Sequence, residues 1–116
     1  MKIKSLYSRV RAKAPIERDE FLDLTERAMR FFTSLYGAVG MSEVGEEPDG
    51  TLPFSSPLSL DDDNSVSELY AEAILSYVEY LLTGESAAYN RAIASAEGAY
   101  RTLWRSRASG KRLRPR

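Results

Sequence analysis

Hydrophobic residues recur along the chain in four blocks. Within each block they are spaced three or four residues apart, which places them on one face of an α-helix. Strict alternation of hydrophobic and polar residues, as in a half-buried strand, defines none of these blocks. The blocks occupy residues 3–10, 19–36, 64–83 and 88–104. We therefore expect an all-α protein, a small helical bundle of about four helices.

Proline and glycine predict where these helices end. Pro15 disfavours the helical conformation in the residue before it, so the first helix is expected to end at Ala14. Gly37 and Gly40 are expected to stop the second helix, since glycine is the usual residue just after a helix end. Gly84 closes the third helix, and a short turn leads into the fourth.

The third helix carries most of the expected core. Its hydrophobic residues form two adjacent rows, so the helix is apolar over most of its circumference, with Tyr77 and Leu81 expected inside. The fourth helix presents alanines on one face, which allows another backbone to approach closely. These two features predict a tight antiparallel pair.

Residues 38–60 predict a long loop or loose hairpin between the second and third helices. The Pro-Asp-Gly sequence at 48–50 is typical of a turn. The segment is nevertheless too hydrophobic for a free linker, and loops of this length are often functional. We expect its hydrophobic side chains to pack on their own subunit or on a neighbour. These candidate contacts are Val44, Leu52, Phe54, Leu58 and Leu60.

Acidic and amide side chains at Asp62, Asp63 and Asn64 immediately precede the third block. Such residues accept hydrogen bonds from the free N–H groups at a helix start, so we predict a helix cap there. A metal site is the alternative, but the spacing of a calcium-binding loop is missing. The further carboxylates Glu68, Glu72 and Glu79 are read as a solvated helix face in preference to a catalytic pair.

The composition excludes several classes of chemistry. The 116 residues include no cysteine and no histidine, so there is no thiolate nucleophile, disulfide or imidazole proton shuttle. We therefore expect no enzyme activity, no cofactor and no metal. Hydrophobic runs are too short for a membrane-spanning helix, and the first residues lack the apolar block of a signal peptide.

Charge is divided sharply along the chain. Residues 1–18 carry a net charge of +5, residues 19–90 one of −13, and residues 91–116 one of +7. Three explanations remain open: the ends pair with the middle inside one molecule, they pair with the middle of another copy, or they bind an acidic partner such as nucleic acid. We predict one domain at 1–105 and a flexible basic tail at 106–116. Candidate partner contacts in this tail are Lys111, Arg112, Arg114 and Arg116.

Tyrosine is frequent in the third and fourth helices. We interpret these side chains as core or rim aromatics, with base-stacking platforms for nucleic acid as the alternative. The residues concerned are Tyr70, Tyr77, Tyr80, Tyr89 and Tyr100.

The order of these elements, together with the sequence SELYAEAILSYVEYLLTGESAAYNRA at 67–92, resembles the small head-tail adaptor proteins of tailed bacteriophages. The resemblance spans roughly residues 16–105 and lies in a capped helix, a short turn and a Tyr/Ala-rich helix. It implies a helical subunit that forms a homo-oligomeric ring joining the portal to the neck or tail and extending the DNA channel. It also implies a location in the virion neck after synthesis in the host cytoplasm.

Under this resemblance the partners are other copies of the chain, the portal protein, the next neck or tail component, and DNA passing through without sequence specificity. The loop at 38–60 and the tail at 106–116 are then candidate arms toward neighbours. A nucleic-acid-binding accessory module that uses its basic ends is the second hypothesis.

Overall fold

The computed structural model describes residues 1–13, 15–42 and 52–113, with side chains described as far as residue 107. It confirms the all-α prediction. The elements are α1 (Ile3–Lys13), α2 (Arg18–Met41), the short 3-10 helix η1 (Glu68–Tyr70), α3 (Ala71–Thr83) and α4 (Ser86–Leu113). In this part of the chain, β-pairing is limited to two isolated bridges, Lys2 with Asp63 and Ser42 with Val66.

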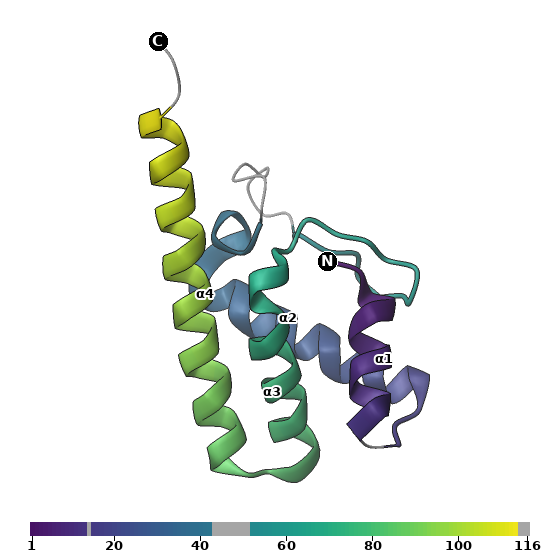
Figure 1. Ribbon diagram of the computed structural model, residues 1–116. Helices are drawn as coiled ribbons and strands as arrows, with labels where there is room; N and C mark the ends of the chain where they lie inside the picture. The colour runs from purple at the N-terminus through teal and green to yellow at the C-terminus, as the bar shows by residue number, and fades with distance from the viewer. Residues whose placement is uncertain (14, 43–51, 114–116) are drawn as a thin grey trace.

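The helices form two layers (Figure 1). α3 and α4 lie side by side and antiparallel, as predicted, and share the most extensive packing in the molecule. α1 lies beside α3 on the side away from α4, and α2 crosses behind these helices. Gly84 ends α3 in the left-handed conformation, at φ 74°, and its N–H donates to the carbonyl of Tyr80 at 2.7 Å. This confirms the predicted turn.

The core lies where α2 meets the layer of α1, α3 and α4. The largest fully buried side chains come from α1, α2, η1 and α3. α4 contributes a buried row of alanines and Leu103. Small side chains on α4 allow the close approach to α3 that the sequence predicted. Tyr77 and Leu81, which we expected inside, are only partly buried at the edge of the core. The largest buried side chains are Ile3, Leu6, Phe21, Met29, Phe32, Met41, Tyr70 and Ile74.

We expected α2 to stop at Gly37. Instead it bends there and continues to Met41. Gly37 has φ 79° and ψ 162°, a backbone conformation that only glycine adopts readily. A Cβ at Gly40 would lie 3.1 Å from the ring of Tyr100, which is tighter than an ordinary contact, so the ring would have to shift by a few tenths of an ångström. The hydroxyl of buried Tyr70 donates to the Gly40 carbonyl at 2.8 Å, which ties this last turn to η1.

The prediction that Asp62, Asp63 and Asn64 cap the third helix is wrong. The helical segment begins at Glu68, and its cap is Ser67, whose hydroxyl accepts the N–H of Leu69 at 3.2 Å. The three predicted residues pair instead with the N-terminal segment. Their backbones bond to it through Ile3 N–H to Asp62 O at 3.1 Å and Asn64 N–H to Met1 O at 3.0 Å. These bonds keep residues 62–64 extended, so the helical segment begins only at Glu68.

The segment between α2 and η1 packs on its own subunit wherever it is described. Phe54 and Leu58 are buried in the core, and Leu52 and Leu60 pack against it in partly buried positions. Packing on their own subunit is one of the two outcomes that we expected for these four side chains. The fifth, Val44, and the predicted turn at 48–50 lie outside the described residues.

α4 extends to Leu113, so the predicted boundary at residues 105 and 106 is not a helix end. In Figure 1 the C-terminal turns of α4 project beyond α3. Lys111 and Arg112 lie on these turns, where only the backbone is described, and Arg114 and Arg116 lie outside the described residues. The predicted helix end at Ala14 also falls outside them.

Candidate interaction site

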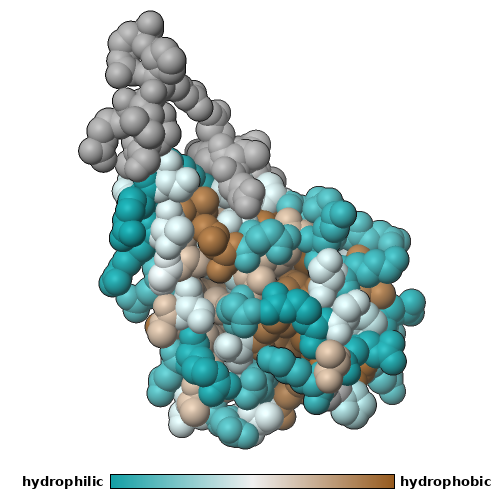
Figure 2. Space-filling model, viewed as in Figure 1, coloured by the Kyte–Doolittle hydropathy of each residue, from teal (hydrophilic) through white to brown (hydrophobic). Residues whose placement is uncertain are grey.

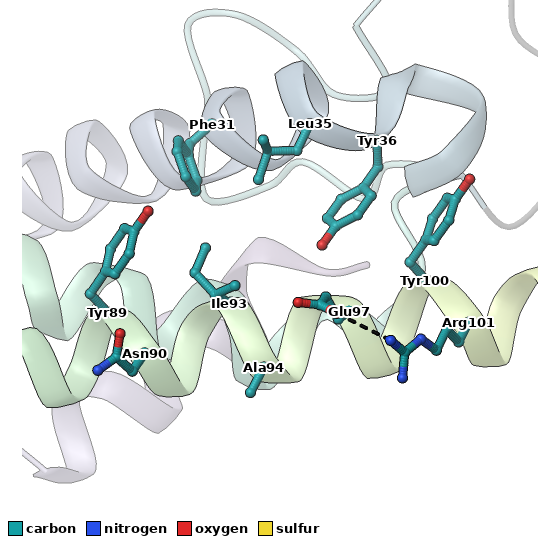
Figure 3. A pocket seen from close by; sticks show the side chains of 10 residues that line it. All are labelled: Phe31, Leu35, Tyr36, Tyr89, Asn90, Ile93, Ala94, Glu97, Tyr100 and Arg101. Atoms are coloured by element: carbon teal, nitrogen blue, oxygen red, sulfur yellow. Dashed lines mark hydrogen bonds and ion pairs between the residues drawn. The ribbon is translucent and has the colours of Figure 1, made fainter.

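A groove lined by aromatic residues lies between α2 and α4. It has a volume of about 790 Å³ and is open to solvent along its length. Figure 3 shows Phe31, Leu35 and Tyr36 pointing from α2 toward α4, and Tyr89 and Ile93 pointing back from α4. We call this hollow the aromatic groove. Its remaining lining residues are Asn90, Ala94, Glu97, Tyr100 and Arg101.

The groove forms because α2 crosses α4 instead of running along it. α4 gives its buried row of alanines to α3 and turns a second row, at Tyr89, Ile93 and Tyr100, toward α2. α2 approaches this row mainly through its last turns, so large side chains on both helices reach into a partly filled gap. The groove is therefore a consequence of helix crossing and needs no special loop.

Three aromatic rings stack in nearly parallel planes at the end of the groove that lies toward the C-terminus of α4. The rings of Tyr36 and Tyr100 lie 4.8 Å apart at 22°, and those of Tyr100 and Trp104 lie 6.4 Å apart at 20°. Trp104 is the outermost, with 59% of its surface exposed. Leu35, which lines the groove between Phe31 and Tyr36, is 53% exposed (Figure 3). Burial raises the pKa of Tyr36, helped by the negative charge of Glu97, so its hydroxyl stays protonated at neutral pH.

A second aromatic cluster supports the other end of the groove. The ring of Tyr77 stacks on Phe31 at 4.6 Å and meets Tyr80 edge-on at 5.6 Å. Tyr80 in turn meets Tyr89 at 5.1 Å. These contacts hold the rings in fixed orientations, and burial raises the pKa of Tyr77. The tyrosines are thus core and rim aromatics, as interpreted from the sequence; Tyr70 is the fully buried one.

The basic ends pair with the acidic middle inside the same molecule at several points. Arg9 of α1 binds Glu72 of α3, and Arg91 of α4 lies 2.9 Å from Glu79. The N-terminal ammonium lies 3.7 Å from Asp63 and donates to the carbonyl of Asn64 at 2.7 Å. The carboxylates of Glu68, Glu72 and Glu79 along η1 and α3 therefore form an exposed face with ion pairs.

Among the described residues, no group of three or more His, Cys, Asp or Glu side chains could hold a metal ion. No helix in this part of the chain is both long enough and apolar enough to cross a lipid bilayer. On the face shown in Figure 2, hydrophilic residues predominate and hydrophobic ones form small separate patches.

Sequence reasoning missed the two most exposed members of this region. The hydrophobic stripes of the second and fourth helices include Leu35 and Trp104, and their spacing alone does not distinguish them from the buried members of these stripes. The sequence did contain one signal. The fourth helix is longer than the third, and near its C-terminal end two aromatic residues and two arginines each recur four residues apart, at Tyr100 and Trp104 and at Arg101 and Arg105. Of the candidate contacts predicted from the sequence, none lines the groove.

Comparison with known proteins adds no relative: no family model, curated protein or solved structure matches this chain.

Proposed function

We propose that this chain is a structural virion protein, a head-tail adaptor whose copies join into a ring between the portal and the neck or tail of a tailed bacteriophage. In this role it extends the channel through which DNA passes without sequence recognition. Its partners are copies of itself, the portal protein and the next neck or tail component. The subunit acts through shape and charge and carries out no reaction.

The observation that carries this proposal is the open aromatic groove with its exposed edge at Leu35 and Trp104. Protein interfaces are enriched in Trp, Tyr and Arg, and anchors of this type account for most of their binding energy. Isolated exposed hydrophobic residues are ordinary, but an aromatic groove with an exposed tryptophan at its edge, stacked on one of the lining tyrosines, is typical of a binding surface. The helical fold and the sequence resemblance agree with this role.

The test is assembly on purified portal rings of tailed bacteriophages. The full chain is mixed with these rings, and complexes are separated by sedimentation and viewed by electron microscopy. We expect a stable complex that carries a ring of this protein on one face of the portal. An unrelated helical protein of equal mass controls for non-specific association. The proposal fails if the chain stays monomeric at all concentrations, both alone and with portal rings.

One feature favours a second candidate function, the nucleic-acid-binding module. Residues 98–116 hold seven Lys or Arg and no acidic residue, and Arg101 and Arg105 lie one turn apart on an exposed side of α4. Phosphate groups are natural partners for such a row. This candidate predicts that the isolated monomer binds duplex DNA and that affinity falls steeply with added salt. Removal of residues 106–116 should then abolish binding, whereas Arg27→Gln on α2 should leave it unchanged.

A further inference from the structure

Two exposed surfaces of this subunit are complementary to each other in charge. The first is the end of the aromatic groove, which we name the cationic aromatic patch. Its residues are Tyr36, Tyr100, Arg101, Trp104 and Arg105. Trp104 stacks on Tyr100 before any partner arrives, which reduces the side-chain entropy lost when the indole is buried.

This patch is positively charged. Arg101 is largely exposed and shares a pair with Glu97 at 3.3 Å. Arg105 is exposed and has no ion-pair partner among the residues that the structure describes. No acidic residue follows Glu97 in the sequence. The patch therefore fits an occupant that combines a hydrophobic side chain with carboxylates.

The chain itself carries such a segment in and before η1. Leu69 is 45% exposed, and the neighbouring carboxylates of Glu68 and Asp63 are both more than half exposed. Residues 61–68 contain four carboxylates, and the N-terminal ammonium, 3.8 Å from Glu68, offsets only part of this charge. We name residues 61–69 the acidic segment. The Ser67 cap and the backbone bonds to residues 1–3 hold it in place.

The two surfaces do not cover each other within one molecule, because Trp104 and Leu69 are both exposed there. We infer that the cationic aromatic patch of one copy binds the acidic segment of a second copy, with Leu69 packed against Trp104 and the carboxylates facing Arg101 and Arg105. This inference rests on the proposed function and specifies its contact between subunits. A contact between two different surfaces can be made twice across a two-fold axis, which closes a dimer, or can repeat head to tail, which closes a ring or extends a filament. The proposed ring requires the head-to-tail arrangement.

Single-cysteine variants test this contact directly, because the natural chain contains no cysteine. Arg105→Cys and Glu68→Cys are made in separate copies, which keeps Trp104 and Leu69 in place, and the two are mixed under mild oxidation. We expect a disulfide-linked heterodimer from this mixture to form much faster than from Arg105→Cys mixed with Glu79→Cys. Glu79 is the matched control, since it is a glutamate with a 47% exposed side chain on α3, outside the acidic segment. Equal rates for the two mixtures would overturn the inference.

Assembly of complementary variants gives a second readout. One copy carries Trp104→Ala and Arg105→Gln; the other carries Leu69→Ala and Glu68→Gln. Each should assemble more weakly than the wild type, on the order of 30-fold for a central anchor. An equimolar mixture should stop at a one-to-one heterodimer, because only one functional pair of surfaces remains. Circular dichroism checks that each variant is folded.

The outcomes separate this inference from the proposed function. If the wild type assembles and both double variants assemble equally well, the contact between Leu69 and Trp104 is refuted, but the proposed ring is not. A wild-type chain that stays monomeric with and without portal rings would refute both. Trp104 is the chain's single tryptophan, so its fluorescence reports the patch alone. Quenching by an oligonucleotide, with no change as the protein concentration rises, would assign the patch to nucleic acid and overturn the inference.

Discussion

Glu26 illustrates how one side chain can hold a long segment in place. Its carboxylate accepts the N–H of Leu58 at 2.9 Å, the hydroxyl of Ser56 at 2.7 Å and the guanidinium of Arg30 at 3.1 Å. Burial alone would raise the pKa of Glu26, but these hydrogen bonds and the charge of Arg30 lower it below the usual 4.5. The ionised carboxylate therefore fastens the segment that carries Phe54 and Leu58 to α2.

Glu26→Gln should lower the free energy of unfolding at pH 7 by about 1–3 kcal/mol, because one amide cannot satisfy three donors. The pKa of Glu26 is lower in the folded state than in the unfolded chain, so its contribution is complete above pH 4.5 and is lost as pH falls further. Urea unfolding across this range measures both effects. Asp23→Asn, which alters an exposed pair with Arg27 on the same helix, is the control and should cost about 0.5 kcal/mol or less. Equal losses for the two variants would contradict this account.

Tyr70 makes a comparable contact in the interior. Tyr70→Phe removes the donor to the Gly40 carbonyl and should destabilise the protein by about 1–2 kcal/mol, since a buried acceptor loses its partner. Burial also raises the pKa of Tyr70 above its usual 10.0, so the folded state keeps a proton that the unfolded chain loses at high pH. Stability should therefore fall as pH rises above about 10, and less steeply in the variant.

Thermal unfolding at pH 7 and pH 10.5 measures this effect. Tyr89→Phe is the matched control, because its hydroxyl has no hydrogen bond within the described part of the chain. Identical alkaline slopes for wild type and Tyr70→Phe would show that the Tyr70 hydroxyl does not carry the effect.

Two glycines in helices should respond in opposite directions to the same change. Gly37→Ala should cost about 1–3 kcal/mol, because φ 79° with ψ 162° is open only to glycine even though a Cβ would meet no neighbour. Gly98→Ala should stabilise the protein by about 0.5–1 kcal/mol, since Gly98 is exposed on α4 with free space for a Cβ. Urea unfolding compares them. A loss at both positions would mean that helix propensity does not decide the result at Gly98.

The bend at Gly37 also determines which parts of α2 and α4 meet. Beyond it the last turn of α2 approaches α4, where Gly40 lets the ring of Tyr100 lie close to the backbone. A straight helix would carry this turn elsewhere and separate Gly40 from the ring of Tyr100. The contact of the last turn of α2 with α4 therefore depends on one glycine conformation.

Contacts between distant parts of the chain hold the C-terminal turns of α4. The guanidinium of Arg107 donates to the carbonyl of Val39 at 2.7 Å and to that of Ser42, which satisfies the free C-terminal end of α2. Arg107→Gln should therefore speed hydrogen exchange at the end of α2 and in α4 near residue 107. Exchange in the α3–α4 turn should not change. Arg105→Gln, on the exposed side of the same helix, is the control, and equal effects of the two variants would exclude this role for Arg107.

Most of the fold followed from local patterns. The periodicity of hydrophobic residues located all four α-helices, Gly84 marked the end of α3, and the alanines of α4 indicated its close packing on α3. The cap was misplaced because Asp62, Asp63 and Asn64 bond to residues 1–3, which lie some 60 residues away in sequence. Local preferences contain no information about such a partner.

The sequence by itself determined the helical class, the antiparallel pair and the lack of thiol and imidazole chemistry, because each depends on residue types and their spacing. The tertiary structure alone decided which hydrophobic side chains stay exposed. Phe54 and Leu58 entered the core and Leu35 and Trp104 stayed outside it, since burial depends on where α2 crosses α4 and on how far α4 extends beyond α3.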